Sequence, residues 1–340
     1  MSIFNTKRPL LIAGPCSAET EEQVLQTAKE LNNQGIKIFR AGIWKPRTRP
    51  NNFEGVGSIG LEWLKKVKEE TGMLVTTEVA NTKHVYEAIK AGIDILWIGA
   101  RTSVNPFAVQ EIADAIKGMN IPIMIKNPVN PDIELWIGAI ERFQDAGIKD
   151  IAVIHRGFSS LSNSKYRNEP KWQIPIEFKR RLKGIPIICD PSHISGRRDL
   201  LQEVSQKAMD LNYDGLMIET HINPDVALSD AKQQLTPKAL KELTDKLIIR
   251  HRKPSDATSP HYKETLEELR TKIDDFDDLL IETISKRMKT AKKIGELKKQ
   301  NKMTILQTGR WENIVKNAIK AGEKEGISAK FINTLYSAIH

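Results

Sequence analysis

The apolar and polar positions of the first 250 residues repeat a two-part pattern. An amphipathic stretch with apolar residues every three or four positions ends at a glycine, and a short run rich in isoleucine follows at once. Glycine adopts the left-handed conformation just beyond a helix end, and an apolar β-branched run is typical of a strand buried on both faces. The pattern predicts eight strands, at residues 10–14, 36–44, 74–79, 94–100, 121–127, 150–157, 185–190 and 215–221.

Helical patterns lie between these predicted strands. They cover residues 21–33, 59–70, 83–90, 106–117, 132–144, 197–211 and 237–249. Eight strand-and-helix units in about 250 residues are typical of an α/β protein with a closed parallel (βα)8 TIM barrel. An open, doubly wound parallel sheet is the alternative that this pattern leaves open.

The pattern changes after residue 249. Residues 250–263 contain two prolines and no apolar periodicity, which indicates a linker. From Glu264 to about Lys299 the apolar residues keep a spacing of three and four. A helix of about 35 residues is about 50 Å long, so it needs partner helices to cover its apolar stripe. Shorter helices are expected at 309–323 and 328–339. We therefore predict a barrel domain at 1–249 and an all-α domain at 264–340.

Composition excludes several classes of protein. The two cysteines, Cys16 and Cys189, are too few for a disulfide framework and point to the reducing cytoplasm. The apolar runs are shorter than the roughly 18 residues of a membrane span. The net charge is +9, and residues 250–340 hold 19 basic against 13 acidic residues. Because these charges are interleaved and aromatic residues are few, nucleic acid is not the expected partner. Small anionic substrates fit the basic balance better.

The predicted strands end at residues that can do chemistry. In a closed barrel the active site lies where the strands end and the helices begin. The residues there are Cys16, Arg40, Glu78, Arg101, Lys126, Arg156, His193 and Glu219. Cations that converge on one mouth repel each other unless an anion belongs among them. Thiolate, imidazole and carboxylate together suit a divalent transition ion. We infer a metal ion beside a dianionic ligand; Lys126 alone would also fit a Schiff-base lysine of a metal-free aldolase.

Several ordered motifs carry a family resemblance. They are Gly14-Pro15-Cys16-Ser17, Lys45-Pro46-Arg47-Thr48, Gly99-Ala100-Arg101, Cys189-Asp190-Pro191-Ser192-His193 and the later Asp230. Together they resemble type I-beta 3-deoxy-D-arabino-heptulosonate 7-phosphate (DAHP) synthase, the first enzyme of the shikimate pathway. The related sialic acid and KDO 8-phosphate synthases share the barrel, but the Lys-Pro-Arg-Thr stretch favours the heptulosonate branch.

The resemblance implies a role for each motif residue. Metal ligands would be Cys16, His193, Glu219 and Asp230, with Mn²⁺ favoured and Fe²⁺, Co²⁺ or Zn²⁺ also suitable. Phosphoenolpyruvate would bind Arg40, Lys45, Arg101, Lys126 and Arg156, and erythrose 4-phosphate would bind Lys45, Pro46, Arg47 and Thr48. Glu78 would order a water molecule or the nearby arginines, and Lys45, Cys16 and His193 would take part in catalysis. One departure is Asn127, which follows Lys126 where the family carries a Lys-Arg-Gly type of sequence.

The C-terminal helical pattern carries a second resemblance. Arg287 and Lys298 are eleven residues apart, which places them within roughly 20° on one helix face. With Arg270 and Arg310 they resemble the all-helical chorismate mutase family in residue type and spacing. The resemblance implies rearrangement of chorismate to prephenate in a homodimer, in which Arg270 serves the partner's site. Arg270, Arg287, Lys298, Arg310 and Glu312 would be catalytic, and Gln307 would contact the substrate.

The chorismate mutase resemblance has two departures. Trp311 stands where the family commonly has an acidic residue, and the chain ends at His340, before the Ser and Gln positions that usually close the site. Two functions therefore stay open for the helical part. One is a bifunctional synthase and mutase, and the other is a synthase whose helical domain dimerises the chain and senses chorismate or prephenate as a feedback ligand.

Overall fold

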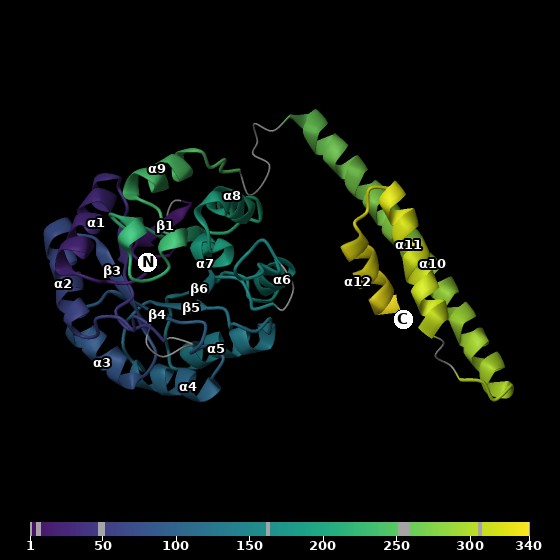
Figure 1. Cartoon of the computed structure of the whole chain (residues 1–340), viewed down its shortest axis with the longest axis horizontal. Coiled ribbons are helices and arrows are strands. Elements are labelled where there is room, and N and C mark those ends of the chain that lie inside the picture. The colour runs from purple at the N-terminus through teal and green to yellow at the C-terminus, as the bar shows by residue number, and fades with distance from the viewer. Residues whose placement is uncertain are drawn as a thin grey trace. The chain divides into compact units, whose positions relative to one another are not determined.

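A computed structural model describes residues 2–4, 8–46, 52–160, 164–250, 259–304 and 308–339 (Figure 1). The chain divides into two compact units, Met1–Arg252 and Lys253–His340. The first unit contains all of the strands that the structure describes, and the second unit is helical.

The first unit is a closed barrel of eight parallel strands. Each strand pairs with the next, and β8 returns to pair with β1 along five residues. The strands are β1 (Leu10–Gly14), β2 (Ile38–Arg40), β3 (Leu74–Val79), β4 (Ile95–Ile98), β5 (Ile123–Lys126), β6 (Ile151–His155), β7 (Ile187–Cys189) and β8 (Gly215–Glu219). The predicted TIM barrel is confirmed, and the β1–β8 pairing excludes the open sheet.

Helices surround the barrel (Figure 1). They are α1 (Glu21–Asn33), α2 (Ile59–Thr71), α3 (Thr82–Lys90), α4 (Pro106–Ala115), α5 (Ile133–Asp145), α6 (Gln173–Arg181), α7 (Pro191–Ser195), α8 (Leu201–Asp210) and α9 (Pro237–Asp245). Short 3-10 turns are η1 (Arg198–Leu200), η2 (Pro224–Val226) and η3 (Ala231–Gln233). Helices α6 and α7 were not among the expected ones. Helix α6 has only two buried residues, and α7 is too short to show a helical period.

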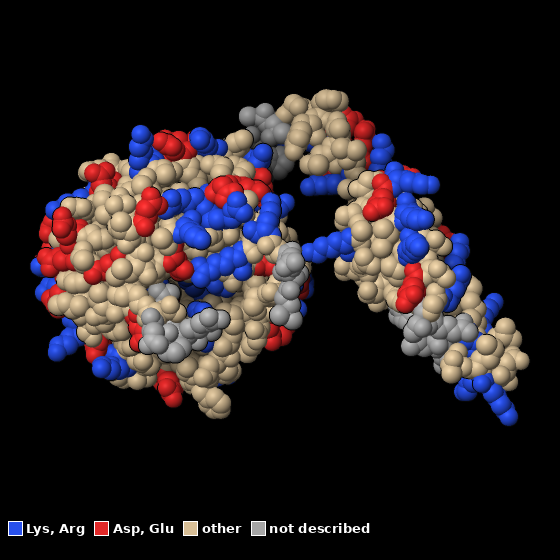
Figure 2. Space-filling view, viewed as in Figure 1, with Lys and Arg blue, Asp and Glu red and all other residues tan. Residues whose placement is uncertain are grey.

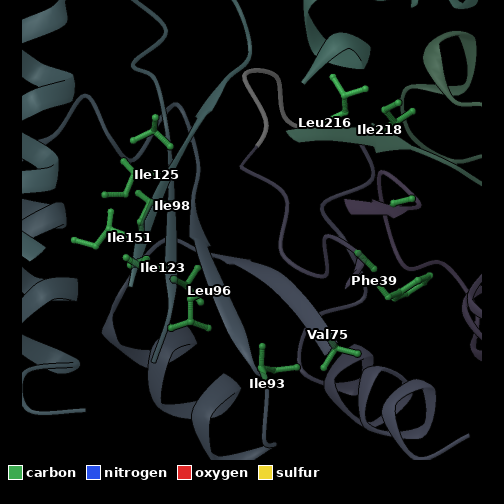
Figure 3. Packing of buried hydrophobic residues seen from close by; sticks show 14 of the residues in the cluster. Phe39, Val75, Ile93, Leu96, Ile98, Ile123, Ile125, Ile151, Leu216 and Ile218 are labelled. Carbon is green, nitrogen blue, oxygen red and sulfur yellow. The ribbon is translucent and has the colours of Figure 1, made fainter. Parts of the chain in front are cut away.

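Strand residues alternate between the barrel interior and the helix layer. Met217 packs in an interior cluster with Ile12, Ile38 and Trp97. Its neighbours Leu216 and Ile218 point the other way and belong to the larger core beneath the helices (Figure 3). Residues on both faces are buried, as a parallel sheet that is covered by helices requires. This alternation decides which side chains at the strand ends face the mouth of the barrel.

The second strand is shorter than predicted. The pattern indicated residues 36–44, but β2 includes only Ile38–Arg40. Beyond Arg40 the chain turns into a loop, in which Lys45 N–H donates to the Glu54 carbonyl at 2.8 Å. The apolar Ile43 favoured a longer strand in the prediction, but in the structure it is fully buried under this loop. The loop carries Lys45 to the mouth.

Within its described residues the second unit contains three helices, α10 (Pro260–Gln300), α11 (Thr308–Lys324) and α12 (Ala329–Ile339). Ile332 of α12 packs onto α11 at Gly322, where a Cβ atom would come within 2.8 Å of the Ile332 side chain. Helix α10 has 41 residues, none of them buried. Its exposed apolar residues include Leu269, Ile273, Phe276, Leu280 and Met288. Across the part of the chain that the structure describes, no helix has the length and apolar character to cross a membrane.

Candidate active site

The last inward-facing position of several strands is polar. Glu219 follows the inward Met217 by two positions, and Arg40 follows Ile38 in the same way. Because strand side chains alternate with a period of two, both side chains point into the barrel mouth. The same spacing places Lys126 after Met124, Arg156 after Ile154 and Asp190 after Ile188. Figure 2 shows lysine and arginine side chains gathered over the part of the barrel where Figure 1 labels α6, α7 and α8.

Three of the four predicted metal ligands form a tight cluster. One ligand atom from each of Cys16, Glu219 and Asp230 lies within 4.8 Å of the other two. Cys16 and Glu219 are completely buried. Asp230 has a φ of +50°, a left-handed conformation that is rare for a residue with a side chain. The barrel closure between β1 and β8 brings the three residues together.

His193 joins this cluster through Glu219. Its Nε2 lies 3.7 Å from Oε1 of Glu219, and its Nδ1 lies 2.7 Å from Oδ2 of Asp190. The Asp190 side chain also caps α7 by accepting from the His193 N–H at 3.0 Å. Burial lowers the pKa of His193, so the imidazole is neutral near pH 7. A carboxylate at one ring nitrogen leaves the other free to bind a metal ion.

The donor set fits a divalent transition ion. Ligands of one metal ion, each about 2.0–2.3 Å from it, lie roughly 3–4 Å apart. Two separations fall in this range: the Cys16 Sγ lies 3.3 Å from Oδ2 of Asp230, and Nε2 of His193 lies 3.7 Å from Oε1 of Glu219. Oε1 of Glu219 is buried, and no hydrogen bond reaches it within the described residues. Burial, with Glu219 nearby, raises the pKa of the Cys16 thiol to about 12, so this thiol binds a metal ion by giving up a proton.

Arg40 lies on the floor of the mouth and is 1% exposed. Its guanidinium stacks over the Trp97 ring at 4.9 Å, and its NH1 lies 3.4 Å from Oε1 of Glu219. Neither Nε nor NH1 makes a hydrogen bond to any described residue. A buried guanidinium with unused donors is costly unless an anion binds it. Trp97 could not be predicted as a site residue, because a tryptophan within a strand is usually part of the hydrophobic core.

Lys45 contacts Cys16 directly. Its Nζ donates to the Cys16 carbonyl at 2.8 Å and lies 3.0 Å from the Cys16 Sγ. The β2–α2 loop therefore places a cation beside the predicted metal ligands. Pro46 is exposed at the rim. Arg47 and Thr48, the rest of this motif, lie outside the described residues.

Lys126 and Asp190 form a buried ion pair, with Nζ 3.0 Å from Oδ2. Burial alone would raise the pKa of Asp190, but His193 and Lys126 outweigh it and hold that pKa well below its usual range. The Asp190 carboxylate therefore orients both His193, a predicted metal ligand, and Lys126, which is predicted to bind phosphoenolpyruvate. The motif around Cys189 contained Asp190, but the sequence did not reveal this double role.

Arg156 is held by two asparagines. Its NH1 donates to Oδ1 of Asn168 at 2.7 Å, and its backbone N–H donates to Oδ1 of Asn127 at 2.7 Å. Asn127 also donates from Nδ2 to the Gly157 carbonyl at 2.9 Å. Asn127 is the residue at which the sequence departs from the family pattern, and its side chain connects the end of β5 to the end of β6 through these hydrogen bonds. Burial lowers the pKa of Arg156 to about 10, which still leaves it charged at neutral pH.

Glu78 reaches the mouth and Arg101 lies at its rim. Oε2 of Glu78 accepts a 2.8 Å hydrogen bond from the Trp97 indole N–H. Gly99 makes room for this carboxylate, because a Cβ atom there would lie 2.1 Å from Oε1 of Glu78. Arg101 is exposed.

Four residues that the sequence analysis missed surround the site. Gln233, Gln234, Arg167 and Asn168 each hydrogen-bond a predicted site residue. They come from the β8–α9 and β6–α6 loops, in which no apolar period marks a position. The Gln-Gln pair shortly after Asp230 was the available signal, since adjacent amides are rarely both buried.

The helical unit keeps its predicted cations apart. With a rise of about 1.5 Å per residue, Arg270 and Arg287 are about 25 Å apart along α10. Arg270 pairs with Glu267, whereas Arg287 and Lys298 are half-buried and Arg310 is exposed. Gln307 lies outside the described residues. A cavity of about 420 Å³ lies at α11 and α12 and is lined by Trp311, Glu312, Val315, Lys316, Ile319, Lys320, Asn333 and Ser337.

Comparison with known proteins agrees with both resemblances. The DAHP synthetase I family matches residues 2–251, and chorismate mutase type II matches residues 269–340. Phospho-2-dehydro-3-deoxyheptonate aldolase of Thermotoga maritima is 34% identical over 237 residues, which is 70% of this chain and 68% of that protein. The crystal structure of the DAHP synthase of Thermotoga maritima has a TM-score of 0.64 at 32% identity and covers 70% of this chain and 67% of its own.

A relative with a different name is more distant. The 2-dehydro-3-deoxyphosphooctonate aldolase of Wolinella succinogenes is 29% identical over 264 residues, which is 70% of this chain and 98% of that protein. The predicted heptulosonate branch is thus the better match. The chain belongs to the DAHP synthetase I family and is a bifunctional enzyme of aromatic biosynthesis, with a DAHP synthase barrel followed by a chorismate mutase type II domain.

Proposed function

We propose that the barrel condenses phosphoenolpyruvate with erythrose 4-phosphate at a divalent metal ion held by Cys16, His193, Glu219 and Asp230. The observation that carries this proposal is the cluster of Cys16, Glu219 and Asp230, whose ligand atoms lie within 4.8 Å of one another. When bound, such an ion polarises the aldehyde oxygen of the sugar phosphate. Mn²⁺ is the ion we favour, and Fe²⁺, Co²⁺ and Zn²⁺ suit the same donors.

The cations of the mouth hold the two anionic substrates together. Phosphoenolpyruvate binds Arg40, Lys126 and Arg156 on the floor, with Lys45 and Arg101 toward the rim. Erythrose 4-phosphate binds Lys45 and the residues after it, Pro46, Arg47 and Thr48. Two anions repel each other in water, so their fixed placement among cations lowers both the electrostatic and the entropic cost of the encounter.

The residues at the mouth orient the reactants for three bond changes. Carbon 3 of phosphoenolpyruvate bonds to the aldehyde carbon, a water oxygen adds at carbon 2, and phosphate leaves from that carbon. We infer that Glu78 orders the water, and the indole N–H of Trp97 holds its carboxylate through Oε2. The unused guanidinium donors of Arg40 are available to the phosphoenolpyruvate oxygens.

The helical domain rearranges chorismate to prephenate without covalent catalysis. We infer that Arg287, Lys298 and Arg310 clamp the dicarboxylate and place a cation at the breaking ether bond, with Glu312 and Gln307 at the same site. The partner's Arg270 completes the site, because Arg270 of the same chain is about 25 Å from Arg287 along α10.

A homodimer through α10 follows from its uncovered apolar stripe. Residues such as Leu269, Ile273 and Phe276 are more than half exposed. Prephenate bound to this domain is the feedback ligand that we propose for the barrel. We also infer a cytoplasmic enzyme, because Cys16 must stay reduced to bind a metal ion.

Two assays on one preparation test these assignments. We expect condensation of phosphoenolpyruvate with erythrose 4-phosphate to stop with a chelator and to return with Mn²⁺, while loss of chorismate is unaffected. Condensation that resists the chelator would refute the metal assignment. Deletion of residues 256–340 is expected to leave condensation intact and to abolish its response to prephenate, and a retained response would refute the feedback role of the helical domain.

A further inference from the structure

We propose that the adjacent amides Gln233 and Gln234 are positioning residues that set the geometry of the metal site through two different ligands. Gln234 fixes the Cys16 backbone, and Gln233 fixes the carboxylate of Glu219. The inference rests on the metal ion proposed above and adds two residues that do not touch it. Both side chains are almost completely buried: Gln233 is 1% exposed and Gln234 is 0% exposed.

Gln234 connects the loop after β1 with the loop after β8 at the barrel mouth. Its Oε1 accepts from the Cys16 backbone N–H at 2.9 Å, and its Nε2 donates to the Ser229 carbonyl at 2.8 Å. The hydroxyl groups of Ser17 and Ser229 lie 2.6 Å apart beside this bridge. Of these contacts between the two loops, only the buried Gln234 amide bonds directly to the Cys16 backbone.

Gln233 acts on the other side of the same loop. Its Nε2 donates to Oε2 of Glu219 at 2.6 Å, and its Oε1 accepts from NH1 of Arg167 at 2.8 Å. Arg167 NH1 also donates to Oδ1 of Asp230 at 2.8 Å. With Oε2 engaged, Glu219 presents only Oε1 to the metal position. Gln233 and Arg167 thus link two predicted ligands, Glu219 and Asp230.

The partners leave each amide a single useful orientation. A carboxylate only accepts and a guanidinium only donates, so the Gln233 amide nitrogen must face Glu219 and its oxygen must face Arg167. For Gln234 the backbone N–H of Cys16 and the Ser229 carbonyl impose an equally fixed orientation. Residues 231–233 form a 3-10 turn, and the backbone becomes extended at Gln234. The side chains of Gln233 and Gln234 therefore reach different predicted metal ligands.

The arrangement predicts separable effects on metal binding. Loss of a group that orients a metal ligand typically weakens affinity about 10- to 100-fold. Gln233 acts through an oxygen ligand, so its loss leaves the bond from sulfur to the metal intact. Gln234 acts through the residue that supplies the sulfur, so its loss changes that bond as well. A role only in general stability would move neither the affinity nor the sulfur signal in this selective way.

The test uses the full chain loaded with Co²⁺, whose thiolate charge-transfer band reports the bond to Cys16. The variants are Gln233→Met and Gln234→Met, which keep the length of the side chain and remove the amide. The control is Gln206→Met, since Gln206 bonds the backbone of Ile248 through both amide atoms, away from the predicted ligands. The Co²⁺ dissociation constant is measured by competition with a chromophoric chelator.

We expect each of the two variants to bind Co²⁺ about 10- to 100-fold more weakly, with the sulfur band reduced only in Gln234→Met, and the control to match the wild type. Gln234→Glu, when protonated, keeps both the acceptor for the Cys16 N–H and a donor to the Ser229 carbonyl, and it is expected to restore the band. If Gln234→Met does not fold, a folded Gln234→Glu protein without the sulfur band would overturn the role of Gln234. Wild-type affinity and spectrum in the Met variants would overturn the inference. A wild-type protein with no sulfur band would instead refute the proposed metal site.

Discussion

The Sγ atom of Cys16 lies 3.3 Å from Oδ2 of Asp230, although the two residues are 214 positions apart in the sequence. Cys16 follows β1 and Asp230 follows β8, and the pairing of these strands closes the barrel. The proposed metal site is therefore assembled where the barrel closes. Its geometry depends on the β1–β8 seam more than on either loop alone.

Replacement of Cys16 by serine tests this seam directly. We expect Cys16→Ser to lower kcat/KM for condensation by about 100-fold or more at limiting metal, because a hydroxyl is a much weaker ligand than a thiolate. The chorismate reaction is expected to stay unchanged, because its predicted residues belong to the other unit. Measurement of both activities on one preparation, with metal titrated, checks this expectation.

Cys189 provides the matched control. It is also completely buried, but it lies on β7 in the core beneath the helices. Cys189→Ser is expected to lower stability by about 1 kcal/mol and to keep the metal affinity of the wild type. Equal loss of metal binding in the two variants would argue that Cys16 acts through the fold and not as a ligand.

Trp97 packs against the guanidinium of Arg40, which is predicted to bind phosphoenolpyruvate. The phenylalanine variant removes the indole N–H bonded to Glu78 and weakens the stacking with the guanidinium. We expect Trp97→Phe to raise KM for phosphoenolpyruvate about 10-fold, which corresponds to about 1.4 kcal/mol. The control Trp136→Phe removes a buried indole that donates to the Ile125 carbonyl in the outer core. It is expected to lower stability and leave KM unchanged.

The sequence predicted the barrel well because its strands are buried on both faces. Runs such as Ile95–Ile98 and Ile123–Lys126 have no polar interruption, and a glycine precedes several of them. The strand-end residues could be predicted for the same reason, since Arg40, Lys126 and Glu219 end apolar runs. Loop residues such as Arg167 and Gln234 could not, because a loop has no period and their partners are distant in the sequence.

His155 predicts how the stability of the barrel depends on pH. Its Nε2 lies 2.7 Å from the Pro170 carbonyl, and its Nδ1 lies 2.9 Å from the Tyr213 hydroxyl. Burial lowers the pKa of His155 to about 3. In the unfolded chain this histidine has a pKa near 6.5. Between about pH 6.5 and pH 3 it is therefore protonated in the unfolded chain but neutral in the folded chain. This contribution to stability is present above about pH 6.5 and is lost as the pH falls toward 3.

The variant His155→Gln removes the titration and can still donate to Pro170. We expect the free energy of unfolding of the wild type to fall between pH 6.5 and 4 by on the order of 3 kcal/mol more than that of the variant. Urea unfolding at several pH values measures the difference. The control His261→Gln changes an exposed residue of α10 and is expected to follow the wild type. Parallel curves for wild type and His155→Gln would contradict the prediction.

The apolar stripe of α10 predicts that the helical domain dimerises. Ile273 and Leu280 are seven residues apart on one face and are 58% and 49% exposed. If a second copy covers them, each contributes about 1.5–3 kcal/mol, and a buried glutamate at either position costs more. The double variant Ile273→Glu with Leu280→Glu is expected to weaken the dimer at least about 100-fold in analytical ultracentrifugation.

Loss of the dimer has a functional consequence that separates it from simple unfolding. Chorismate mutase activity is expected to fall with dimer concentration, because we propose that the partner's Arg270 completes each site, whereas condensation in the barrel is expected to continue. The control variant Thr271→Glu with Ser285→Glu adds the same charge on the opposite face of α10 and is expected to stay dimeric. A monomeric double variant with full mutase activity would show that one chain supplies the whole site, and it would remove Arg270 from the proposed shared role.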